Sequence, residues 1–274
     1  MSAEHIAAAG LGPLPTRETR SSAQWFAEHY HDAADAVLAF FAEAGIDLAG
    51  RSVADIGAGD GTIDLGVAVK GRPERLVGFD VVETDMAALA AMARREGVVA
   101  RLPENLEFRT SRPRSLPAED DSFDLAFSWS TFEHVTEPTA LLREVRRVLR
   151  PHGVLMIQIW PFFHSQHGSH LWHWFPEGFV QLLRDEADIE AAVRRRLGPD
   201  PEWAEVLLAE FRSCNRLTLD GLQAALLAAG FHVAKLELLT EPVHVPPELE
   251  RYPLSQLGVA GVKLLAGIRA DGVR

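Results

Sequence analysis

The sequence predicts a doubly wound α/β fold with a mostly parallel sheet, and three observations carry that prediction. Short apolar runs alternate with helical stretches between residues 51 and 160, as in folds built from strand–helix–strand units. In the run 53–62 (VADIGAGDGT), an apolar strand leads into a glycine-rich turn and a helix start. Two more strand patterns follow residue 230 and bring the expected sheet to seven strands.

The elements follow one another in a regular order. Strands are expected at 51–56, 75–80, 105–109, 123–129, 153–160 and 231–239, with a last antiparallel strand at 256–269. Helices are expected within 23–45, at 61–70, 84–97 and 137–149, and from Thr218 to a C-terminal glycine at Gly230. About 70 residues separate the fifth and sixth strands, far more than a crossover needs. The segment 161–216 is therefore interpreted as an insertion, with helical stretches at 177–196 and 201–212.

This order predicts four regions. Residues 1–49 form an N-terminal helical cap, and residues 50–160 form an α/β core that binds a cofactor. Residues 161–216 form a helical lid, and residues 217–274 complete the α/β core.

Composition excludes several classes of partner. A net charge of −12 argues against nucleic acid or an anionic membrane as the main partner. No apolar run is long enough to span a bilayer, and the N-terminus lacks a basic region before an apolar core. The single cysteine, Cys214, excludes an internal disulfide and a multi-cysteine zinc site. We expect a cytoplasmic protein.

The glycine-rich turn indicates the ligand. Its glycines stand at 57, 59 and 61, whereas a dinucleotide fingerprint needs a glycine where Thr62 stands. Asp55 would repel a diphosphate but attract an ammonium group. S-adenosylmethionine (SAM) carries an ammonium, a sulfonium and a ribose diol, and no phosphate. The turn therefore suits SAM better than NAD, with Asp55, Gly57 and Gly59 as expected contacts.

A second carboxylate agrees with this interpretation. Asp80 ends the run 75–80 (RLVGFD), where an acid at the tip of the second strand can accept hydrogen bonds from both ribose hydroxyls. An ordinary helix-capping Asp is the alternative.

With these two motifs, the runs 122–135 (SFDLAFSWSTFEHV) and 141–155 (LLREVRRVLRPHGVL) make the chain resemble the class I SAM-dependent methyltransferases. The resemblance covers residues 50–160 well and 217–270 more loosely. It implies a Rossmann-like methyltransferase sheet, methyl transfer from SAM with S-adenosylhomocysteine as product, and Ser128, Ser130 and His134 beside the cofactor. One departure is Arg112, which stands near the place where such enzymes often have an acid that meets the adenine amino group.

The lid segment 161–216 is expected to bind the acceptor, the molecule that receives the methyl group. The main candidate is the run 160–175 (WPFFHSQHGSHLWHWF), where four histidines recur every three residues among aromatic side chains. Histidine titrates near neutrality and can take the proton of a hydroxyl, while aromatic rings offer a face to a sugar or planar ring. The runs 168–171 and 211–218 resemble segments of glycan and secondary-metabolite methyltransferases, which favours His170 as the base, followed by His167. The expected acceptor contacts are Glu133, Trp160, His164, Trp172 and His173.

Alternatives stay open at this loop. The histidines have no carboxylate near them in the sequence, so a metal there would be zinc or nickel rather than magnesium. We assign no metal ligand, and some histidines fit a merely structural aromatic cluster. The favoured function is O-methylation of a sugar, oligosaccharide or other small molecule. Metal-dependent O-methylation, N-methylation and non-catalytic SAM binding are the alternatives, and the sequence does not decide whether the chain forms a homodimer.

Overall fold

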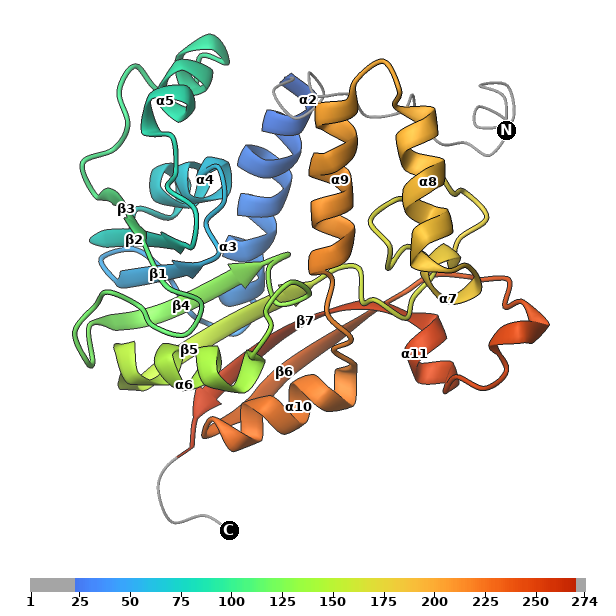
Figure 1. Ribbon diagram of the computed structural model, residues 1–274. Coiled ribbons are helices and arrows are strands. Elements are labelled where there is room, and N and C mark those ends of the chain that lie inside the picture. Colours follow the sequence, from blue (N-terminus) through green and yellow to red (C-terminus); the bar gives the residue numbers. More distant parts are fainter. Residues whose placement is uncertain (1–22, 270–274) are drawn as a thin grey trace.

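The computed structural model describes residues 23–269, which form a seven-stranded sheet with helices on both faces (Figure 1). The strand order is β3-β2-β1-β4-β5-β7-β6, and only β7 runs antiparallel to its neighbours. The strands are β1 (Ser52–Ile56), β2 (Arg75–Asp80), β3 (Leu106–Thr110), β4 (Phe123–Trp129), β5 (Leu149–Ile159), β6 (Phe231–Thr240) and β7 (Val259–Ile268). The predicted doubly wound, mostly parallel fold is confirmed.

Two hydrophobic cores lie on opposite faces of this sheet. One holds apolar side chains of α3 (Ala34–Ala42), α4 (Thr62–Gly71) and α5 (Met86–Arg95). The other holds those of α6 (Pro138–Val148) and α10 (Leu219–Ala228). The chain order reverses between β1 and β4, and ligands of such sheets bind beyond the carboxyl ends of the strands at this point.

Three boundaries differ from the sequence prediction. The last strand begins at Val259 because a short helix, α11 (Leu254–Gly258), follows Pro253. Strand β5 begins at Leu149, where that residue pairs with Phe123 of β4. The N-terminal helix consists of α2 (Ala23–Phe26), a π-helical segment (Ala27–Ala33) and α3. The part of the predicted cap before residue 23 lies outside the described residues.

The insertion after β5 has a hydrophobic core of its own. Its helices are α7 (Val180–Leu183), α8 (Glu186–Arg196) and α9 (Pro201–Ser213), with α8 and α9 side by side beyond the ends of β4 and β5 (Figure 1). Arg194 and Arg212 each form ion pairs with Glu190 and Glu205, which join the two helices. The core comprises Phe163, Leu171, Trp174, Phe175, Val180, Ile189, Val193, Trp203, Ala204, Leu207, Leu208, Phe211 and Cys214.

Among residues 23–269, no helix combines the length and the apolar character needed to cross a membrane.

Candidate active site

The turn between β1 and α4 depends on glycine. Gly57 has φ +93°, and a Cβ built there would lie 2.2 Å from Oγ1 of Thr131, in the loop after β4. Gly59 has φ +56° with no atom within 4 Å of such a Cβ. Because a side chain at 57 would displace the neighbouring loop, the backbone of β1 approaches the end of β4 only with glycine there.

Asp80 fixes the other side of this turn. Its Oδ2 accepts a hydrogen bond from the Gly59 N–H at 2.9 Å, and its Oδ1 accepts one from Val82 N–H at 2.9 Å. Each carboxylate oxygen accepts more than one hydrogen bond, so this orientation leaves room for ribose hydroxyls.

A cavity of about 720 Å³ opens beside these residues, at the ends of β1, β2 and β4. Three residues of the predicted cofactor set line it: Gly57, Asp80 and His134. Arg112 also lines it, and an ion pair between Arg114 and Glu137, at 3.0 Å, lies at its wall. The other lining residues are Ile56, Phe79, Val81, Ser111, Pro113, Ser115, Leu116, Thr131, Val135, Thr136 and Leu141.

Asp55 does not line this cavity. It is only 2% exposed and interacts with a second buried carboxyl group, that of Asp64 on α4. Burial, then the charge of Asp64, raises the pKa of Asp55 well above its usual range, and burial raises the pKa of Asp64 to about 7. The sequence motif predicts a cofactor contact here, and the structure instead points this side chain into the protein.

The two serines of β4 and the loop after it make hydrogen bonds within the protein. Ser128 is buried and its Oγ donates to the carbonyl oxygen of Ile56 at 2.7 Å, which joins β4 to β1. Ser130, with φ +48°, donates from both Oγ and its N–H to Oε1 of Gln158 at 2.9 Å. Neither serine is among the residues that line the cavity.

The structure separates the four histidines of the loop after β5. His164 lies against Tyr252 and His173 against Trp172 and Trp174. His167 lies 6.2 Å from Trp160 and 5.9 Å from Trp172 between ring centroids. The Trp160 and Trp172 rings are themselves 5.3 Å apart, edge to face. Of the predicted site residues, Trp160, His167 and His173 therefore surround Trp172, whereas His164 packs against Tyr252.

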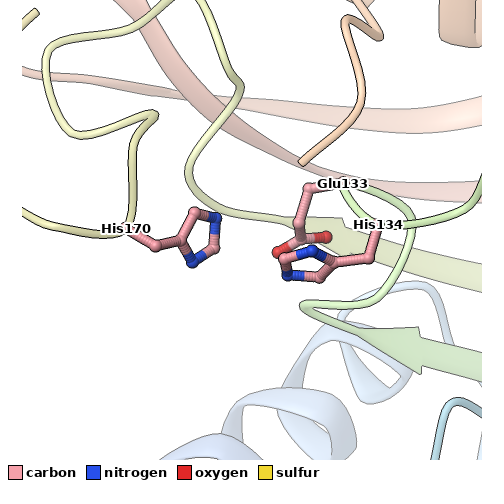
Figure 2. A group of neighbouring side chains, drawn as sticks. All are labelled: Glu133, His134 and His170. Atoms are coloured by element: carbon pink, nitrogen blue, oxygen red, sulfur yellow. The ribbon is translucent and has the colours of Figure 1, made fainter. Parts of the chain in front are cut away.

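His170 instead joins Glu133 and His134. In Figure 2 the three side chains point toward one another, Glu133 and His134 from the loop after β4 and His170 from the loop after β5. One ligand atom of each lies within 4.8 Å of the others, and the two imidazole centroids are 5.0 Å apart. His170 has φ +57°, a strained conformation of the kind found at functional sites.

Burial sets the protonation of this group. It raises the pKa of Glu133 to about 8, partly offset by the backbone N–H groups of Glu133 and Trp160. Burial, and then the charge of His170, lowers the pKa of His134 to about 4. His134 is therefore a neutral imidazole near neutrality.

Although no carboxylate is near the four histidines in the sequence, three lie close to them in the folded chain. Glu210 on α9 lies 3.5 Å from Nδ1 of His170, and Glu241 lies 3.3 Å from Nε2 of His167. Glu133 is the third carboxylate. The sequence prediction missed Glu210, Glu241 and Ser213, whose Oγ is 2.8 Å from Nδ1 of His134. These residues lie far from the loop in sequence, and no local pattern identifies them.

Two contacts connect the neighbouring regions to the site. Trp25, in the N-terminal helix, donates from Nε1 to Asp60 of the glycine turn at 3.0 Å. Asn215, just after α9, donates from its side chain to the carbonyl oxygens of Phe132 and Val135 and from its N–H to that of Glu133. The end of the insertion therefore fixes the loop that carries Glu133.

Comparisons with known proteins agree with this geometry. A family model described as a methyltransferase domain matches residues 54–157. Ubiquinone biosynthesis O-methyltransferase of Xanthomonas oryzae pv. oryzae is 32% identical over 119 residues, covering 43% of this chain and 46% of that protein. The uncharacterized methyltransferase YcgJ of Bacillus subtilis is 31% identical over 105 residues, covering 38% and 39%. The match thus spans less than half the length of either curated relative.

Solved structures share the fold over most of the chain. The structure of YcgJ from Bacillus subtilis has a TM-score of 0.53 at 19% identity, covering 88% of this chain and 100% of that one. A SAM-dependent methyltransferase from Aquifex aeolicus has a TM-score of 0.51 at 19% identity, covering 88% and 93%. Residues 54–157 thus match a methyltransferase domain, and the sheet order and the glycine turn facing Asp80 are those of the class I SAM-dependent methyltransferase fold, for which SAM is the cofactor.

Proposed function

We propose that this chain transfers the methyl group of SAM to a hydroxyl oxygen of a small molecule. The observation that carries the proposal is the cluster of Glu133, His134 and His170, which adjoins the cavity lined by Gly57 and Asp80 because His134 belongs to both. Titratable side chains of the loops after β4 and β5 thus lie beside the cofactor cavity. The relative named as an O-methyltransferase supports oxygen rather than nitrogen as the acceptor atom.

The reaction is an in-line displacement at the activated methyl carbon. The carbon–sulfur bond breaks and its electron pair stays on sulfur, while the acceptor oxygen forms the new bond to carbon. Holding the oxygen in line and excluding water supplies much of the acceleration. The hydroxyl proton leaves to a base, which adds about 10²- to 10⁴-fold for a weakly acidic hydroxyl.

Two histidines have the surroundings of such a base. His170 has Glu210 beside its Nδ1, and its buried Nε2 has no hydrogen-bond partner. His167 has Glu241 beside its Nε2, and its buried Nδ1 has no partner. A carboxylate on one ring nitrogen orients the imidazole and leaves the other nitrogen to take a proton.

The acceptor is proposed to be a sugar, an oligosaccharide or another small hydroxyl compound. Trp160 and Trp172 offer ring faces and edges on which a sugar or planar ring can pack. His164 and His173 each have an unpartnered buried Nδ1, and Glu133 has two unpartnered oxygens, so hydroxyls would find hydrogen-bond partners there.

Labelled methyl transfer from SAM tests this function, with sugars, oligosaccharides, phenols and amines as acceptors. Transfer to a hydroxyl compound, with S-adenosylhomocysteine formed in equal amount, is the expected result. Transfer to amines alone would replace the proposal by N-methylation. Tight SAM binding without transfer to any acceptor would contradict it and favour a non-catalytic SAM-binding protein.

A further inference from the structure

The Glu133 carboxylate is buried without an adequate partner. The residue is 3% exposed, and neither Oε1 nor Oε2 accepts a hydrogen bond of normal geometry. A carboxylate taken out of water without compensation is strongly destabilised, so a cation at this position would remove a large unfavourable contribution.

The two neighbouring histidines are arranged as metal ligands usually are. Nδ1 of His134 is engaged by Ser213 Oγ at 2.8 Å, and Nδ1 of His170 faces Glu210 at 3.5 Å. Hydrogen bonding at one ring nitrogen leaves Nε2 as the donor atom for a ligand. Histidines that bind metals almost always have such an outer partner, commonly a carboxylate, which fixes the tautomer and the ring orientation.

The spacing of the three donors also suits one ion. Their ligand atoms lie within 4.8 Å of one another. Zinc binds nitrogen and oxygen at about 2.0–2.2 Å, which puts two ligands of a tetrahedral site roughly 3.5 Å apart. The observed separations exceed this spacing by at most about 1.3 Å, a shift that side-chain rotation can supply.

We propose that Glu133, His134 and His170 bind one divalent transition-metal ion, with zinc as the first candidate. Two imidazoles and one carboxylate suit zinc, iron, cobalt or nickel, whereas magnesium and calcium prefer oxygen ligands throughout. Three protein ligands leave a coordination position open. His134 lines the cofactor cavity, so that position is available to an acceptor hydroxyl.

The inference deepens the proposed function and rests on it for the identity of the acceptor. A bound divalent ion supplies Lewis acidity, which lowers the pKa of an oxygen ligand. His170 is then a ligand, and the proton goes to His167, the other histidine of this loop that has a carboxylate beside it. Compounds with two adjacent hydroxyls become the favoured acceptors, because an ion with three protein ligands can expand to five-coordinate and bind both oxygens.

Metal content and cobalt binding test the site without reference to turnover. The purified full chain is measured for bound metals, stripped with a chelator and titrated with Co²⁺, whose visible absorption reports protein ligands. One equivalent is expected in the wild type. Glu133→Gln and His170→Ala should each weaken Co²⁺ binding by about 100-fold or more, and Ser213→Ala by about 10- to 100-fold. His152→Ala, an exposed histidine on β5, is the matched control and should bind as the wild type does.

The outcomes separate this inference from the proposed function. Unchanged Co²⁺ binding in both Glu133→Gln and His170→Ala, with native-like thermal melts, would overturn the site. Absence of stoichiometric binding in the wild type would overturn it as well. Methyl transfer that persists in the stripped, metal-free protein would overturn its catalytic use and leave the O-methyltransferase proposal standing. Stoichiometric metal without transfer to any acceptor would support the site and contradict the proposed function.

Discussion

The glycine turn after β1 and the histidine loop after β5 lie at the same edge of the sheet but are built in different ways. The turn takes its shape from its own residues, since Gly57 and Gly59 have positive φ and Asp80 closes the turn from the adjacent strand. The histidine loop depends on distant segments, because Glu210, Ser213 and Glu241 engage its histidines or their neighbour His134. The proposed cofactor site is therefore locally encoded, whereas the proposed acceptor site depends on how the insertion folds.

The largest effects on stability should come from replacements in the core of the insertion and in the core beneath α6 and α10. Leu208 lies in the core of the insertion and Leu142 in a core of the sheet, and both are fully buried. Replacing either by Ala should lower the free energy of unfolding by about 2–5 kcal/mol. Denaturant unfolding and hydrogen exchange by mass spectrometry measure the loss and locate it.

The two replacements should differ in where they act. Leu208→Ala should raise exchange mainly within 161–216 and keep the SAM Kd within about threefold, because the insertion opens as a unit of its own. Leu142→Ala should raise exchange across the sheet and weaken SAM binding. Equal effects of Leu208→Ala on both regions would show that the two regions unfold together.

A second prediction concerns the buried carboxyl pair beneath the glycine turn. The pKa of Asp64 is about 7 in the folded protein against 3.8 normally, so between these values the folded protein keeps a proton that the unfolded chain releases. Asp64 by itself therefore lowers the free energy of unfolding as pH rises from about 4 to 7, by at most about 4 kcal/mol. Asp64→Asn should flatten this dependence and raise the Tm at pH 8 by several degrees.

Thermal melts at pH 5 and pH 8 measure the effect. The matched control is Asp188→Asn, at an exposed carboxylate of α8, which should leave the slope unchanged. A wild-type stability that rises with pH over this interval would contradict the assignment of a protonated pair.

A third prediction concerns the turn itself. Gly57→Ala places a Cβ 2.2 Å from Thr131 Oγ1 and should weaken SAM binding about 100-fold, or about 2.7 kcal/mol. Gly97→Ala is the matched control, since Gly97 also has positive φ (+72°) but no atom within 4 Å of an added Cβ. It should cost about 1 kcal/mol of stability and leave the SAM Kd unchanged. Calorimetric titration with SAM separates the two, and equal affinities would show that the turn tolerates a side chain.

The sequence predicts the cofactor side better than the acceptor side, for physical reasons. Gly57 and Asp80 are predictable because each lies at the end of a strand in a short strand–turn–helix stretch. The conformation of such a stretch follows from residues that are neighbours in the sequence. The motif predicts that Asp55 contacts the ligand. A central parallel strand is covered on both faces, however, and the Asp55 side chain points inward to Asp64. The sequence suggests His170 as a candidate base but does not reveal the carboxylate beside it, because Glu210 reaches His170 only through the packing of α9.

Comparison of SAM affinity with turnover in His170→Ala tests the division between the two regions most directly. We expect a SAM Kd within about threefold of the wild type and a kcat lower by about 10²- to 10⁴-fold, the range of a lost acid–base or metal-binding group. Parallel loss of SAM binding and turnover would contradict the division, because His170 would then belong to the cofactor site. Unchanged kcat would remove His170 from the chemistry altogether.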